Sequence, residues 1–138
     1  EFMSKIDAIV MGKNTFETVT NFDIDWPYEK HVFVLSRSLK DIPETLKEKV
    51  TLLKGNLKDI LKTIHKKGFY NLYIDGGKTV QNFLKEDLID ALIINTLPII
   101  LGDGIPLFDV LPKSLKFNHI KTEVFLNEIV QSHYHSKI

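Results

Sequence analysis

The sequence contains no cysteine among its 138 residues. This absence excludes a disulfide framework and any mechanism that uses a thiol as the nucleophile. A chain without cysteine fits the reducing environment of the cytoplasm, and we expect the protein there.

The chain also lacks an excess of charge of either sign, since 18 basic residues balance 18 acidic ones. No net field therefore attracts nucleic acid or an anionic membrane. The lysine-rich stretch 47–67 is interrupted by Glu48 and Asp59 and has no row of aromatic residues, which favours a solvated helix face over a nucleic-acid groove. No apolar run approaches the roughly 20 residues of a membrane span, and no signal peptide opens the chain. We expect neither nucleic acid nor membrane as a partner.

The remaining composition, 43% hydrophobic and 26% charged, is that of an ordinary globular protein. The length favours one domain over residues 1–138. Residues 1–5 resemble the last turn of a helix that runs into a strand. This start favours a lost N-terminal segment over a cloning remnant before Met3, because a sheet protein rarely opens on the end of a helix.

Strand-like and helix-like segments alternate along the first two thirds of the chain. This alternation predicts an α/β fold with a mostly parallel sheet covered by helices on both faces. After residue 96 the pattern changes to a turn-rich loop and a C-terminal antiparallel hairpin around Leu126 and Asn127. The predicted strands are 8–11, 31–35, 50–53, 72–74, 91–96, 117–125 and 128–136, and the predicted helices start near Asn14 and cover 43–49, 57–67 and 79–85.

Three predicted strand ends carry residues suited to an anion. In open parallel sheets, ligands bind beyond the carboxyl ends of the strands, where helices begin. The three segments are Gly12-Lys13-Asn14-Thr15, Ser36-Arg37-Ser38 and Asp75-Gly76-Gly77-Lys78-Thr79. Each offers hydroxyl donors or close backbone approach together with a cation, which is what a phosphorylated ligand needs. A single Gly-Gly is equally explained as a tight turn, but three such turns at one sheet edge favour phosphate binding.

The segments IVMGKNTFE, VFVLSRSL, LYIDGGKTVQNFL and PIILGDGIPLF resemble, in this order, those of the dihydrofolate-reductase-like fold. The resemblance spans nearly the whole chain. It is greatest to the reductase domain of bifunctional riboflavin-biosynthesis deaminase-reductases and their stand-alone relatives. It implies a three-layer α/β domain that binds NADPH.

The resemblance also implies where the cofactor binds. Gly12, Lys13 and Thr15 would lie along its phosphates, and Ser36 and Arg37 would meet the adenosine 2′-phosphate. The predicted cofactor site comprises Gly12, Lys13, Thr15, Leu35, Ser36, Arg37, Asp75, Gly76, Gly77, Lys78, Thr79 and Val80. In dihydrofolate reductases the Gly-Gly bond is cis, so a cis bond is implied at Gly76–Gly77. A charge-assisted hydrogen bond from Arg37 to the 2′-phosphate is worth about 1.5–3 kcal/mol, which favours NADPH over NADH.

No catalytic residue is assigned, because the resemblance places the acidic residue of dihydrofolate reductases, the first strand and the nicotinamide loop before Glu1. Gly102, Asp103 and Gly104 are expected to border the substrate pocket. Asp103 is more simply a turn residue whose carboxylate bonds its own backbone than a catalytic acid. Asp75 is expected to accept hydrogen bonds from the amides of its turn.

The function implied is NADPH-dependent reduction of a small heterocycle, with a ribosylamino-pyrimidine favoured over a dihydrofolate or pterin. Because these 138 residues contain no cysteine, we expect no zinc-deaminase segment among them. A non-catalytic nucleotide-binding protein is the alternative from another class.

His133 and His135 share a strand face but have no third ligand, so no metal is expected. Trp26 is expected to pack on the sheet edge rather than near adenine, and the apolar segment 97–101 suggests a homodimer.

Overall fold

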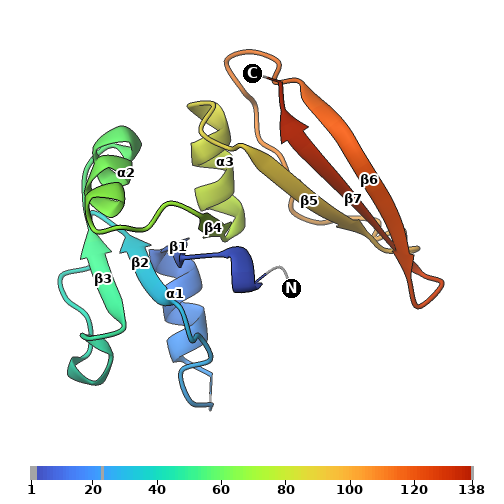
Figure 1. The fold of residues 1–138 in the computed structure, drawn as a ribbon. Coiled ribbons are helices and arrows are strands. Elements are labelled where there is room, and N and C mark those ends of the chain that lie inside the picture. The colour runs from blue at the N-terminus through green and yellow to red at the C-terminus, as the bar shows by residue number, and fades with distance from the viewer. Residues whose placement is uncertain (1–2, 23, 138) are drawn as a thin grey trace. The chain divides into compact units, whose positions relative to one another are not determined.

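The computed structural model describes residues 3–22 and 24–137, which form two compact units divided after Val80. Figure 1 shows the elements along the chain. The first unit holds η1 (Met3–Lys5), β1 (Ala8–Gly12), α1 (Lys13–Thr20), β2 (His31–Leu35), η2 (Glu44–Leu46), β3 (Val50–Leu53), α2 (Leu57–Lys66) and β4 (Leu72–Asp75). Helix α3 (Gly77–Lys85) begins in the first unit, and the second unit holds β5 (Ala91–Thr96), β6 (Phe117–Phe125) and β7 (Ile129–Ser136).

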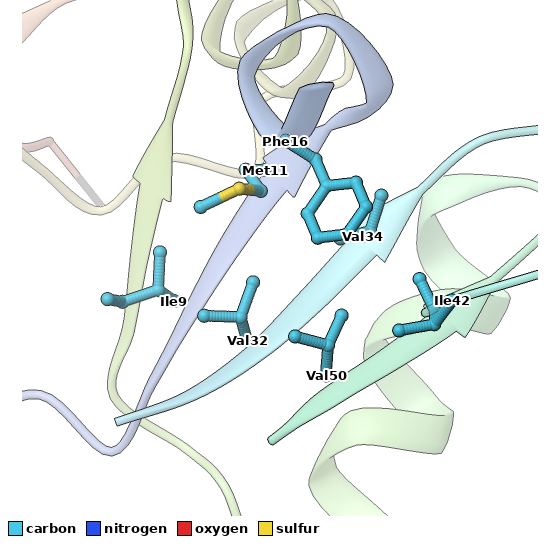
Figure 2. Close-up of a cluster of buried hydrophobic side chains, with 7 residues drawn as sticks. All are labelled: Ile9, Met11, Phe16, Val32, Val34, Ile42 and Val50. Carbon is cyan, nitrogen blue, oxygen red and sulfur yellow. The ribbon is translucent and has the colours of Figure 1, made fainter. Parts of the chain in front are cut away.

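The first unit is built on a wholly parallel four-stranded sheet in the order β3-β2-β1-β4. Its central strands are apolar on both faces, as strands covered on both sides must be. One face carries a buried cluster into which α1 contributes Phe16, and Figure 2 shows its seven members, Ile9, Met11, Phe16, Val32, Val34, Ile42 and Val50. Phe33 points to the opposite face, where its ring contacts Phe69, just after α2. Helical segments therefore cover both faces, which confirms the predicted α/β architecture.

Local signals explain where α2 begins and ends. The Asn56 side chain accepts a hydrogen bond from the Asp59 amide at 2.9 Å, which caps the first turn. Ile60 and Ile64 form its buried face, and Gly68, with φ +94°, follows the helix end. The helix predicted at 43–49 is shorter, since only Glu44–Leu46 form a 3₁₀ turn after Pro43.

The implied cis bond at Gly76–Gly77 was wrong, because every peptide bond among the described residues is trans. The chain turns instead through Gly76, whose φ of +96° lies in the region that favours glycine. The helix then begins at Gly77, two residues earlier than predicted.

The second unit contains a three-stranded antiparallel sheet in the order β5-β7-β6. The C-terminal hairpin is confirmed, with Leu126 and Asn127 both at positive φ and the Glu128 amide bonded to the Phe125 carbonyl. The assignment of residues 91–96 to the parallel sheet was wrong, since β5 pairs antiparallel with β7. A strand's own residues do not specify its partner, because pairing is a long-range contact.

Candidate functional site

The sheet register brings the three predicted turns together. Gly12, the last residue of β1, pairs with Leu35 at the end of β2, and Met11 pairs with Asp75 at the end of β4. β1 lies between β2 and β4, so the segments that follow Gly12, Leu35 and Asp75 leave the same edge of the sheet side by side. All twelve residues of the predicted cofactor site therefore belong to the first unit and to one sheet edge or the helix starts beside it.

Two helix N-termini, those of α1 and α3, lie at this edge, and both favour an anion. The N-cap of α1 is Gly12, which makes no side-chain capping bond. Neither helix has an acidic residue in its first turn, whereas Lys13 and Lys78 place cations there. A cation at the positive end of a helix dipole is unfavourable by itself, and an anion bound between the two termini would offset that cost.

Threonine hydroxyls lie in the same first turns. Thr79 in α3 is only 8% exposed, and its hydroxyl makes no hydrogen bond to any residue in the described ranges. The Thr15 hydroxyl in α1 is equally without a partner within residues 3–22 and 24–137. Thr79 is a buried residue and Thr15 is half-buried, and both hydroxyls are available to donate a hydrogen bond to a ligand. At Gly77, the first residue of α3, no heavy atom of the described residues beyond its chain neighbours and its own helix backbone lies within 4 Å of where a Cβ would stand.

The turn after β2 is organised by Ser36. Its hydroxyl accepts hydrogen bonds from the amides of Ser38 (3.2 Å) and Leu39 (3.0 Å). Lys13 Nζ reaches this turn from α1 and donates to Ser38 Oγ at 3.3 Å. Arg37 is exposed and pairs with no acidic residue of the described chain. Ser38 belongs to the anion-suited turn predicted from the sequence but not to the twelve residues of the predicted cofactor site, and its contact with Lys13 adds it to them.

Asp75 does not accept hydrogen bonds from the amides of its turn within the described chain, so that expectation was wrong. Tyr73 and Asp75 are two residues apart on β4 and therefore lie on the same face of the strand. Burial raises the pKa of the Tyr28 hydroxyl above its usual value, and the negative charge of Asp75 raises it further. The pKa of Tyr73 is raised by the same two causes in the same order. Asp75 thus faces tyrosine hydroxyls.

Trp26 packs against the core cluster beneath the sheet edge. Its ring meets Phe16 edge-on at 5.9 Å and Tyr28 at 5.1 Å between centroids. The indole Nε1 is buried and has no hydrogen-bond partner in the part of the chain that the structure describes. The packing predicted for this residue is present.

The predicted substrate-pocket residues belong to the second unit, and the cofactor turns belong to the first. Asp103 accepts a hydrogen bond from the Gly104 amide at 2.8 Å, and Gly102 has a φ of +85°. The carboxylate therefore bonds its own backbone, as a turn residue does.

The second unit also has a surface hollow that sequence reasoning missed, with a volume of about 490 Å³. It is lined by Asn95, Leu97, Phe125, Ile129 and Gln131. The Gln131 side chain donates to Asn95 Oδ1 at 3.0 Å, so the polar part of the lining is internally bonded. The hollow depends on cross-strand neighbours of three strands, which single-segment patterns do not reveal.

Across the described ranges, no three histidine, aspartate or glutamate side chains gather as metal ligands. Within the same residues, no helix is both long and apolar enough to cross a bilayer.

Comparisons with known proteins all point to one family. The family model of the RibD C-terminal domain matches residues 1–131. The YwjB protein of Bacillus subtilis (strain 168) is 32% identical over 136 residues, which cover 97% of this chain and 76% of that protein. The riboflavin biosynthesis protein RibD of Aquifex aeolicus (strain VF5) is 33% identical over 111 residues, which cover 74% of this chain but only 31% of that protein.

A solved structure supports the same family. The crystal structure of a riboflavin biosynthesis-like protein from Shewanella sp. PV-4 is 53% identical in sequence, with a TM-score of 0.94. The similarity covers 99% of this chain and 77% of that one.

Proposed function

The chain belongs to the RibD C-terminal domain family, which is reductase-like, and we propose that it is an NADPH-dependent reductase of a small heterocyclic substrate. The family supports an oxidoreductase of riboflavin-type chemistry. The cofactor, the substrate and the residues that bind them are our proposal.

The observation that carries the proposal is the Thr79 hydroxyl, which lies in the first turn of α3 and lacks a partner among the described residues. It belongs to an edge with a second helix N-terminus, two lysines and the open face of Gly77. A diphosphate fits this set, because its oxygens accept hydrogen bonds from hydroxyls and amides and its charge offsets Lys13 and Lys78. When bound, NADPH would supply the hydride.

The turn after β2 supports NADPH over NADH. Arg37 is free to pair with a phosphate, and Lys13 and Ser38 already lie within hydrogen-bond distance of each other beside it. Arg37, Lys13 and the two serines together would recognise a phosphate monoester such as the 2′-phosphate. The protein's residues would hold and orient the cofactor.

For the substrate we propose a ribosylamino-pyrimidine, reduced at its sugar to the ribityl form. The support is the family and the named relatives that belong to riboflavin biosynthesis. We assign no residue as the proton donor. We also propose a homodimer, supported by the exposed apolar side chains of Leu97, Ile99, Ile100 and Leu101, which sedimentation tests.

The experiment is a titration with NADPH and, in parallel, NADH. Trp26 is the only tryptophan and reports binding by fluorescence, with calorimetry as the second readout. We expect selective NADPH binding that Arg37→Ala weakens by about ten- to a hundredfold without changing NADH binding. Lys40→Ala is the matched control, as an exposed cation a few residues away. Binding of neither nucleotide would contradict the proposal, and equal binding of both would contradict the role of Arg37.

Turnover then separates the substrates. NADPH oxidation with the ribosylamino-pyrimidine and none with dihydrofolate is the expected result. The reverse would favour a pterin reductase. Tight NADPH binding without oxidation on either substrate would favour a nucleotide-binding protein.

A further inference from the structure

Two glycines and two threonines at the sheet edge contact each other reciprocally. Gly12 precedes α1, and a Cβ on it would lie 2.7 Å from the Oγ1 of Thr79, which belongs to α3. Gly76 precedes α3, and a Cβ on it would lie 2.5 Å from the Oγ1 of Thr15, which belongs to α1. Each turn therefore leaves room for a hydroxyl from the helix that starts in the other turn.

Position 12 requires glycine for a steric reason and not because of its backbone conformation. Its φ of −89° and ψ of 175° are open to any residue. Among the described residues, and apart from the chain neighbours of Gly12, the Thr79 hydroxyl is the only heavy atom within 4 Å of where a Cβ would stand. Gly76 differs, because its φ of +96° already disfavours a side chain.

Thr79 has little freedom to move aside. It is 92% buried, and β-branched side chains have few χ1 rotamers in a helix. Its hydroxyl has no hydrogen bond within the described chain that would hold it in place. Close packing against Gly12 is thus what sets its position.

From this geometry we infer that Gly12 and Gly76 are positioning residues, which leave room for the hydroxyls of Thr79 and Thr15 and so join the two helix starts into one rigid unit. We call the four residues Gly12, Thr15, Gly76 and Thr79 the threonine–glycine interlock. The interlock fixes the spacing between the two N-termini, and Gly12 acts through Thr79 rather than by touching a ligand. Its effect on cofactor binding rests on the proposed function, whereas its effect on stability does not.

A thermal-unfolding cycle tests the contact. We expect Gly12→Ala to lower Tm by about 5 °C, the usual size of an overpacked methyl in a protein of this length. In the Thr79→Ala background the same change should cost less than about 1 °C, because the colliding atom is gone. Gly77→Ala is the stability control, since its Cβ would meet nothing, and Tm should stay within about 2 °C. Equal losses in the two backgrounds would overturn the interlock.

A binding cycle tests the positioning role. Gly12→Ala should weaken NADPH binding about tenfold in the native background and less than twofold in the Thr79→Ala background. Thr79→Ser/Gly12→Ala should recover most of the binding, since serine keeps the hydroxyl and turns more freely. An equal loss in both backgrounds would mean that Gly12 touches the cofactor itself, which contradicts the inference. If the native protein binds no nucleotide, the proposed function fails, and the Tm cycle alone decides the interlock.

Discussion

β1 and β5 have similar apolar content but very different burial. Ala8 to Met11 of β1 are fully buried, whereas no residue of β5, β6 or β7 is buried. β1 lies between two parallel strands with apolar side chains covered on both faces. Burial therefore follows from the neighbours of a strand and not from its own composition. The first unit should therefore contribute most of the free energy of unfolding, and substitutions in the second unit should destabilise the protein less.

The largest difference in stability loss between the two units is expected for the replacement of two phenylalanines. Phe33→Ala in β2 should lower the free energy of unfolding by about 3–5 kcal/mol, because the ring is fully buried. Phe125→Ala in β6, where the ring is 41% exposed, should cost about 1 kcal/mol or less. Urea unfolding followed by circular dichroism measures both. Equal losses would show that the second sheet is as buried in solution as the first.

The next largest difference in stability loss is expected between Gly102 and Gly76, two glycines with similar positive φ. Gly102→Ala in the second unit should cost about 1–2 kcal/mol, because its φ is +85° but nothing lies within 4 Å of a Cβ. Gly76→Ala in the first unit should cost about 1–3 kcal/mol more, because of the added contact with Thr15 Oγ1. The same unfolding assay applies. Equal costs would mean that Thr15 yields without penalty.

A smaller effect is expected from Asp7, whose carboxylate accepts the amides of Tyr70 (2.8 Å) and Asn71 (2.9 Å). The Asn71 and Tyr70 amides lower its pKa below the ordinary value. A lowered folded-state pKa stabilises the protein above the unfolded pKa of about 4, and this contribution is lost as the pH falls through the lowered value. The Tm gap between native protein and Asp7→Asn should thus be widest near neutrality and narrow below about pH 4. A gap independent of pH would contradict this account.

The smallest effect is expected in the second unit, where the hydrogen bond and charge of Lys121 lower the pKa of Glu123. The sign of the pH dependence is the same as for Asp7, but both partners are exposed. Glu123→Gln should change Tm only slightly, and salt of about 1 M, with a Debye length near 3 Å, should abolish the difference. A salt-independent loss would show that this pair is shielded from solvent.

Much of the fold was predictable because its signals are local. Asn56 and Gly68 bound α2 by capping and by positive φ, and the hairpin turn follows from Leu126 and Asn127. The convergence of the three turns was also predictable, since parallel strands end at a common edge. The partner of β5 was not, because antiparallel pairing with β7 is a contact between distant segments.

The predicted cofactor residues were grouped correctly on one edge, but their individual roles were not all visible in the sequence. Asp75 was expected to clamp its turn, and the alternation of β4 instead turns it toward tyrosine hydroxyls. Ser38 was predicted only as part of its turn, and its contact with Lys13 became visible in the tertiary structure.

The sequence alone determined the family, the succession of strands and helices and the chemical character of the three turns. These depend on residue type and on preferences that act over a few neighbours. Only the tertiary structure decided that Thr79 meets Gly12 and that Thr15 meets Gly76. The parallel pairing of β1 with β4 places the two helix starts side by side, and close packing then leaves room for a hydroxyl but not for a methyl group.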